Sequence, residues 1–205
     1  MELQATDWNV VVVGAWNTAI LTPDGIRKRL FELPEGTPVD IEVAVDRPGY
    51  FRVRHGGTLV TPSPTILDVM GGLGDYDSLS KACAVAKKAL FNLPETPVAA
   101  AGINIRYRID QLPDELIDLI KVSLDDDLSD RGYLIVGRTT KRTLALTPGV
   151  VNIEIAQGPD IEGVITINFH LDSTDTATLA AWIDRVEEFF NMSSKLLALL
   201  KLGDT

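Results

Sequence analysis

The order in which apolar patterns succeed one another constrains the fold of this chain more than any other feature. Residues 8–92 carry a strand pattern, a helix pattern, several strand patterns and a long helix pattern, and residues 99–202 repeat that order. Strands are recognised as alternating or continuous apolar runs, and helices as apolar stripes at three- and four-residue spacing. Two halves with the same order predict an internal duplication.

The first half is predicted to contain strands at 8–16, 39–45, 49–60 and 65–70, and helices at 22–33 and 76–93. Thr22 and Pro23 suit the N-cap and the first turn of the first helix. The segment 49–60 is predicted to be a hairpin that turns at Gly56-Gly57. The alternation in 39–45 predicts burial of its branched residues, Val39, Ile41, Val43 and Val45.

The second half is predicted to contain strands at 99–110, 132–146, 149–157 and 163–171, and helices at 113–122 and 176–202. Its last three strands suggest an antiparallel meander. We therefore predict an α+β fold, an internally duplicated β-α-β(3-4)-α unit that forms a helix-backed antiparallel sheet. The predicted repeats are 1–95 and 96–205, packed as one pseudo-twofold domain.

This order resembles the TATA-binding-protein-like fold, in which a duplicated unit forms a curved antiparallel sheet backed by helices. The resemblance covers nearly the whole chain but lies in element order alone. Neither the phenylalanines with which that family wedges DNA nor its basic rim can be matched here. The resemblance therefore implies a fold and not a function.

Composition excludes several classes of function. Apolar residues make up 45% and charged residues 23%, as in a soluble globular protein, and no apolar run reaches the ~20 residues that span a bilayer. The start of the sequence has no signal-peptide pattern, so we expect a cytoplasmic location. The net charge of −10 disfavours a nucleic-acid partner. One cysteine and two histidines exclude a Cys/His zinc site, and we expect no metal or cofactor.

Residues 69–78, "VMGGLGDYDS", pass from a predicted strand to a predicted helix through Gly71, Gly72 and Gly74. A glycine-rich loop before a helix can hold a phosphate on backbone N–H groups. The dinucleotide-binding pattern is incomplete, because Asp77 stands where its third glycine or alanine belongs. We therefore predict a hinge, with Asp77 capping the helix.

Other candidate sites are interpreted as structural. The acidic run 124–132 lacks the central glycine and the final glutamate of a calcium loop, so we expect a solvated loop. Cys83 falls on the apolar stripe of an alanine-rich helix and is predicted to lie in the core. His55 and His170 have no Ser/His/Asp pattern beside them, so no catalytic residue is assigned.

The residues expected to bind a partner lie on the sheet face opposite the helices. If apolar residues face the helices, this face carries a polar set, which comprises Asp40, Glu42, Arg52, Arg54, Asn104, Arg106, Arg108, Asn152, Glu154, Asn168 and His170. Two interpretations stay open: ion pairs on a solvated face, or a surface that recognises carboxylates or phosphates. The predicted binding residues are Arg52, Arg54, Asn104, Arg106, Arg108, Asn168 and His170.

Three functions follow as hypotheses. The first is a non-catalytic binding or assembly module that engages a protein partner, or a second copy as a homodimer, through this face or through the apolar end 195–202. The second is a small-molecule-binding protein or enzyme in which Arg106, Arg108 and His170 hold an anionic ligand. The third is nucleic-acid binding by analogy with the saddle-shaped fold, which the charge disfavours.

Overall fold

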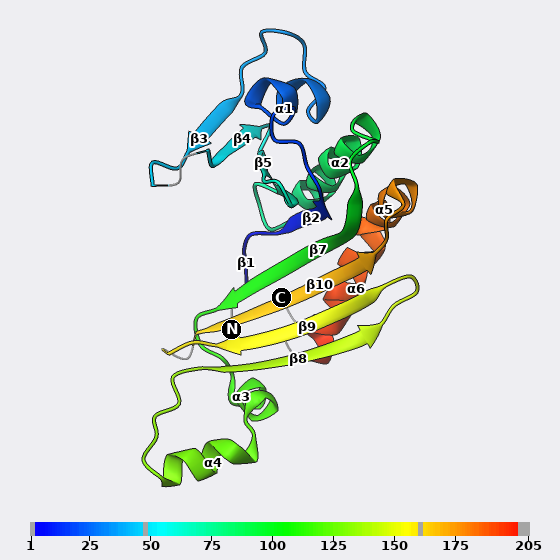
Figure 1. Ribbon diagram of the computed structural model, residues 1–205. Coiled ribbons are helices and arrows are strands. Elements are labelled where there is room, and N and C mark those ends of the chain that lie inside the picture. The colour runs from blue at the N-terminus through cyan, green and yellow to red at the C-terminus, as the bar shows by residue number, and fades with distance from the viewer. Residues whose placement is uncertain (1–2, 47–48, 160–161, 201–205) are drawn as a thin grey trace.

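A computed structural model describes residues 3–46, 49–159 and 162–200. The ten strands of this part of the chain form one antiparallel sheet in the order β3-β4-β5-β6-β2-β7-β10-β9-β8, with β1 paired to β7 (Figure 1). The predicted α+β fold with a helix-backed antiparallel sheet is confirmed.

The strands are β1 (Gln4–Ala5), β2 (Asn9–Gly14), β3 (Asp40–Val43), β4 (Phe51–His55), β5 (Thr58–Pro62), β6 (Ile66–Met70), β7 (Val98–Ile109), β8 (Arg138–Ala145), β9 (Val150–Gln157) and β10 (Gly163–Asp172). The helices are α1 (Pro23–Arg29), α2 (Tyr76–Asn92), α3 (Asp114–Ile120), α4 (Ser123–Asp130), α5 (Thr176–Ile183) and α6 (Val186–Leu199).

The strand order is symmetric about the contact between β2 and β7. On each side the last strand of a half (β6 or β10) lies beside that half's first strand, followed by β5 or β9 and then β4 or β8. The division into repeats 1–95 and 96–205 stays a prediction, and this order is the one that a duplication would produce.

The two junctions between last strand and helix also correspond. Asp75 caps α2 by accepting a hydrogen bond from the Ser78 N–H at 2.7 Å, and Asp175 caps α5 by accepting one from the Thr178 N–H at 2.8 Å. The cap of the first junction is therefore Asp75, and the expectation for Asp77 is wrong, because the helix begins one residue before it, at Tyr76.

The core lies between the sheet and helices α2, α5 and α6, which cover one face (Figure 1). Alternate strand residues such as Ile103, Ile105 and Ile167 point toward these helices and are fully buried. Phe169 of β10 stacks on Phe189 of α6, with ring centroids 4.7 Å apart. Removal of this apolar surface from water is the main force that holds sheet and helices together. The residues between the buried ones form the opposite face, which we call the open face.

The hairpin between β4 and β5 turns where the sequence indicates. Gly56 and Gly57 have φ values of 55° and 82°, and β4 and β5 pair directly on either side. Two consecutive positive φ values match the twist of a hairpin and favour glycine at both positions.

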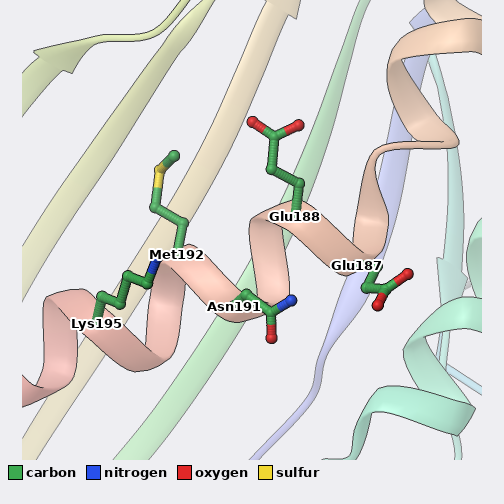
Figure 2. Close-up of a pocket in the computed structure, with 5 residues that line it drawn as sticks. All are labelled: Glu187, Glu188, Asn191, Met192 and Lys195. Atoms are coloured by element: carbon green, nitrogen blue, oxygen red, sulfur yellow. The ribbon is translucent and has the colours of Figure 1, made fainter.

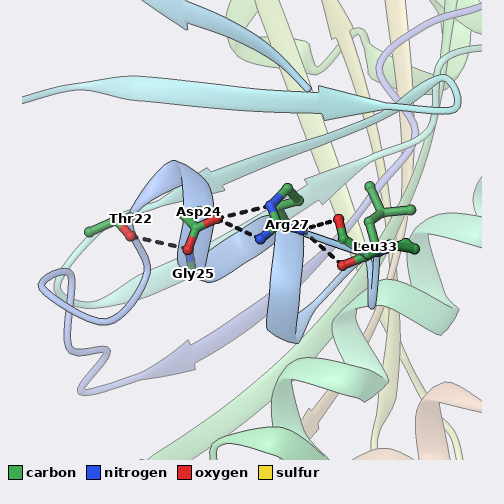
Figure 3. Close-up of polar contacts among 6 residues, drawn as sticks. Thr22, Asp24, Gly25, Arg27 and Leu33 are labelled. Carbon is green, nitrogen blue, oxygen red and sulfur yellow. Dashed lines mark hydrogen bonds and ion pairs between the residues drawn. The ribbon is translucent and has the colours of Figure 1, made fainter. Parts of the chain in front are cut away.

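Helix α1 belongs to the core of the first half. Thr22 is its N-cap, with Oγ1 accepting a hydrogen bond from the Gly25 N–H at 3.1 Å (Figure 3). Ile26 and Leu30 are fully buried. The predicted cap at Thr22 is therefore present, and the helix ends at Arg29 rather than at residue 33.

Arg27 closes the turn that follows α1. Its buried guanidinium donates to Asp24 at 2.7 and 2.9 Å, to the carbonyl of Leu33 at 2.9 Å and to the carbonyl of Pro34 (Figure 3). A charged group can be buried here because a carboxylate and two carbonyls satisfy its donors. Arg27 thus ties the start of α1 to the loop after it.

The prediction of burial for strand 39–45 is wrong for three of its four branched residues, since only Val39 is partly buried against the core. Ile41 is half exposed, and Val43 and Val45 are 67% and 100% exposed. β3 is the edge strand of the sheet, at the end away from α5 and α6 (Figure 1). Alternation therefore marked a strand correctly but could not show that no helix covers it.

The segment between β7 and β8 also differs from expectation. The acidic run 124–132 is mainly helical, as α4, and is not a loop, and residues 133–137 belong to neither a helix nor a strand. Asp125 of α4 is buried beside Arg138, the first residue of β8, with 2.5 Å between carboxylate and guanidinium. This ion pair lowers the pKa of Asp125 and holds α4 against the sheet edge.

The C-terminal helix is broken into α5 and α6 around residues 184–185. In the apolar end, Leu197 is buried and Leu196 and Leu200 pack against the core, whereas Leu199 is 80% exposed. Most of this end therefore completes the core. Residues 201 and 202 lie outside the described residues.

Candidate functional site

A row of polar side chains crosses six strands of the open face, hydrogen-bonded end to end. It comprises Thr143 (β8), Asn152 (β9), Asn168 (β10), Asn104 (β7), Asn9 (β2) and Asp68 (β6), with donor–acceptor distances of 2.6–2.9 Å. The first five residues lie directly opposite their neighbours in the strand register. We call this row the amide ladder.

The four amides of the ladder all point the same way. Arg106 donates to Asn9 Oδ1 at 3.2 Å, so the amide nitrogen of Asn9 must face Asp68, to which it donates at 2.6 Å. Each amide nitrogen therefore donates toward Asp68, whose carboxylate can only accept when ionised. Aligned hydrogen bonds of this kind polarise and strengthen one another.

Asp68 is the charged end of the ladder. Burial raises the pKa of its carboxyl, while the hydrogen bond from Asn9 and the charges of Arg106 and Arg52 act in the opposite direction. Asn9, the next member, is only 6% exposed although it lies on the open face. The centre of this face is therefore a closed hydrogen-bonded network rather than a set of unused polar groups.

The predicted binding arginines do not converge. On β4, Arg54 bonds Glu42 at 2.7 Å, and Arg52 bonds the Tyr50 hydroxyl at 2.9 Å and lies 4.0 Å from Glu42. Arg108, toward the end of β7, bonds Glu162 at 2.9 Å.

Among the described arginines, Arg106 is the one hydrogen-bonded to the amide ladder, and it also donates to the carbonyl of Asp7 at 2.8 Å. The four predicted binding arginines thus lie in three places on the open face, each engaged by a protein acceptor.

Of the predicted set, the structure brings together Asn104, Asn168 and Arg106. His170 lies on the same face, and its Nε2 is 3.0 Å from Asp172, two residues further along β10. His55 lies against Phe31, with the two rings tilted by 54° and their centroids 5.6 Å apart. His170 is bonded to a carboxylate and His55 contacts an aromatic ring, so the geometry does not pair either histidine with a nucleophile.

The glycine loop is shaped by close packing. A Cβ on Gly71 would come within 3.0 Å of Ser78, one on Gly72 within 2.4 Å of the Gly57 carbonyl, and one on Gly74 within 2.1 Å of Ala5. Asp75 already occupies the start of α2 with its carboxylate. These contacts account for the three glycines without a bound phosphate and support the hinge interpretation.

Cys83 is buried, and burial raises the pKa of its thiol far above the ordinary value. A buried neutral thiol is a poor nucleophile, which agrees with a core role. Within the described residues, no group of three or more His, Cys, Asp or Glu side chains could hold a metal ion. In the same part of the chain, no helix is long and apolar enough to cross a membrane.

A shallow groove of about 550 Å³ runs along α6 (Figure 2). Its lining comprises Glu187, Glu188, Asn191, Met192 and Lys195, all from one helix. Glu188 is engaged by Arg185 at 2.7 Å, which lowers the pKa of this carboxyl. The groove contains none of the predicted binding residues and presents no convergent set of donors to a ligand.

Exposed apolar side chains gather in a segment that sequence reasoning did not single out. We call residues 114–137, which include α3, α4 and the extended stretch after them, the arm. Its exposed apolar residues are Leu119, Val122, Leu124, Tyr133, Leu134 and Val136. Figure 1 shows the arm extending past the β8 end of the sheet. The apolar run 133–136 was the available signal, but it was interpreted as the start of a strand.

Comparison of the sequence with protein-family models gives no match, and comparison with curated proteins gives none either. The function must therefore be argued from the geometry above.

Proposed function

We propose that this chain is a non-catalytic binding module and that its protein partner contacts the arm. The observation that supports this is the exposure of the arm's apolar residues, with Leu134 at 86% and Tyr133 at 63%. Contiguous exposed apolar surface on a folded protein commonly marks a site of protein contact.

The arm is held against the rest of the protein but is only partly buried. Leu116 and Ile120 are buried on one side of α3, and Asp125 is held by Arg138. These contacts fix the arm in place while six of its other apolar side chains face solvent. A pre-positioned apolar surface lowers the entropy cost of binding a partner.

The alternative of an anionic small-molecule site receives less support. Arg106, Arg108 and His170 were its expected ligands, and each contacts an acceptor from the protein itself. A ligand would have to replace those contacts at each of the three residues. Nucleic acid would in addition meet the carboxylates of Glu42 and Asp68 on the same face.

Site-specific photocrosslinking tests the proposal. p-Benzoylphenylalanine is placed at position 134 or 136 of the arm and, as a matched control, at position 199, where Leu199 is equally exposed but outside the arm. We expect a discrete crosslinked band from positions 134 and 136 and none from 199. Mass spectrometry of the band then shows whether the partner is another protein or a second copy.

A second substitution distinguishes a specific contact from nonspecific hydrophobic association. Tyr133→Asp in the crosslinking background should remove the band from position 134, because it places a charge in the apolar contact. Identical bands from positions 134 and 199, or no band from the arm, would overturn the proposal.

A further inference from the structure

β8 is the long edge of the sheet. It pairs with β9 through eight consecutive register positions, and among the described strands β9 is its only neighbour. In an antiparallel pair, alternate residues direct both backbone groups away from the partner strand. Half of the β8 residues therefore direct N–H and C=O groups away from β9. Helix α3 contacts this strand, and from Lys141 onward every side chain of the strand is exposed.

This edge is basic, although the chain as a whole has a net charge of −10. β8 contains Arg138, Lys141 and Arg142 and no acidic residue. Arg138 is held by Asp125, and Arg142 donates to the Thr140 hydroxyl at 2.8 Å. Lys141 lies opposite Glu154 of β9 in the strand register. Lys141 and Arg142 are nevertheless both exposed and adjacent, so they project from opposite faces of the strand. Pairing of β8 with a second β8 would bring like charges together, which disfavours a second copy docked edge to edge.

We infer that β8 binds an extended acidic segment of a protein partner, which adds to the sheet as a further strand. Adjacent carboxylates on the incoming strand would lie opposite Lys141 and Arg142, one on each face, and the backbone groups would complete the ladder. The inference rests on the proposed function and adds the chemistry of the partner. The arm leads directly into β8, so one partner can contact Leu134, Val136 and the strand edge together.

Two cations are few for a polyanion site. Single-stranded nucleic acid would gain two phosphate contacts at β8 and leave the outward backbone donors and acceptors of the strand without a matching partner. A peptide strand satisfies both the charges and the backbone groups, and for this reason it is the better fit.

The experiment uses the full chain and a fluorescein-labelled peptide, Thr-Val-Thr-Glu-Glu-Val-Thr-Val, followed by fluorescence anisotropy. We expect saturable binding of this peptide and at least tenfold weaker binding of the same peptide with both Glu replaced by Lys. The double substitution Lys141→Glu/Arg142→Glu should lower the affinity for the acidic peptide by about tenfold or more. The matched control Lys81→Glu/Lys195→Glu makes the same change in net charge on α2 and α6 and should leave binding within about twofold.

Backbone methylation distinguishes strand addition from charge attraction alone. Two peptides are made, one N-methylated at the odd positions and one at the even positions. An added strand uses only one of these two sets of N–H groups, so one methylated peptide should bind like the parent and the other should not.

Four outcomes overturn the inference: equal behaviour of the two methylated peptides, loss of binding in the control variant, tighter binding of a twelve-nucleotide single strand, or no binding of the acidic peptide. Far-ultraviolet circular dichroism of each variant verifies that it is folded. If the peptide experiments fail but position 134 gives a specific crosslink, the proposed function stands and only this inference is overturned. If that crosslink is absent, the proposed function itself is overturned.

Discussion

The segments that follow the two central strands occupy corresponding places in the chain and have opposite roles. After β2, helix α1 is capped by Thr22, closed by Arg27 and buried through Ile26 and Leu30. After β7, helices α3 and α4 have no side-chain cap and leave most of the arm's apolar residues in solvent. Segments at corresponding positions of the two halves can therefore differ in burial: the helix after β2 packs into the core, whereas the arm after β7 exposes apolar side chains.

Truncation of one apolar side chain in each segment tests this contrast most strongly. Ile26→Ala should lower the free energy of unfolding by about 2–5 kcal/mol, because it leaves a cavity in a packed core. Leu134→Ala should change it by less than about 0.5 kcal/mol. Urea unfolding followed by tryptophan fluorescence measures both, and similar losses for the two variants would contradict the contrast.

Arg27 gives the next largest effect. Arg27→Ala removes the hydrogen bonds to Asp24, Leu33 and Pro34 and the packing of a buried side chain, at a cost of about 1–3 kcal/mol. The control is Arg131→Ala in the arm, where the residue is exposed and a change within about 0.5 kcal/mol is expected. Urea midpoints that fall equally in both variants would mean that the two segments are equally integrated.

The halves differ again at corresponding positions of the amide ladder. Asp68 and Asn168 each lie seven residues before the aspartate that caps the next helix, Asp75 or Asp175, but only Asp68 carries a charge. Burial raises the pKa of Asp68, so the folded protein binds this proton more tightly than the unfolded chain does. Ionisation of Asp68 therefore opposes folding, and its cost is present at neutral pH and disappears as the pH falls toward the unfolded pKa.

Exchange of these two side chains tests that difference. Asp68→Asn keeps an acceptor for Asn9 and should stabilise the protein at pH 7 by about 0.5–1 kcal/mol, with the gain shrinking toward pH 4. Asn168→Asp should lower the free energy of unfolding at pH 7, and this loss should shrink as the pH falls. Urea unfolding between pH 4 and 7 measures both, and a pH-independent gain for Asp68→Asn would contradict the assignment.

The smallest effect concerns a feature that the halves share. Hydrogen bonds from Ser78 and Thr178 lower the pKa of Asp75 and Asp175, so both carboxylates stabilise the fold above the unfolded pKa and this contribution is lost as the pH falls through the lower folded value. Asp75→Asn and Asp175→Asn keep the caps and should each flatten the acid side of the stability profile by a similar amount. A flattening in only one variant would show that the junctions are not equivalent.

Much of the fold could be predicted because periodicity reports local structure. The cap at Thr22, the hairpin at Gly56-Gly57 and the polar side of β7 and β10 all follow from residues close in sequence. The exposure of Val43 and Val45 could not be predicted, because it depends on how far the helices reach over the sheet. Periodicity specifies which residues share a face but not which part of that face is covered.

The candidate site was predictable only in part. Asn104, Asn152 and Asn168 were assigned to one polar face, but Asn9 and Asp68 were not, because Asn9 opens an apolar run that offers no alternation. The direction of the amides depends on Arg106, which meets Asn9 across 97 residues of sequence. The arm was missed because an extended apolar stretch has the same pattern whether it pairs or stays in solvent.

The amide ladder also favours one register between neighbouring strands. A slip of one residue between β2 and β7 would turn Asn104 or Asn9 toward the helices and bring a core residue such as Ile103 to the solvent. Each such slip would bury an amide without a partner and break links on both sides of it. The sheet joins segments almost a hundred residues apart in sequence. The hydrogen bonds of the amide ladder can all form only when each of its six strands is in the correct register.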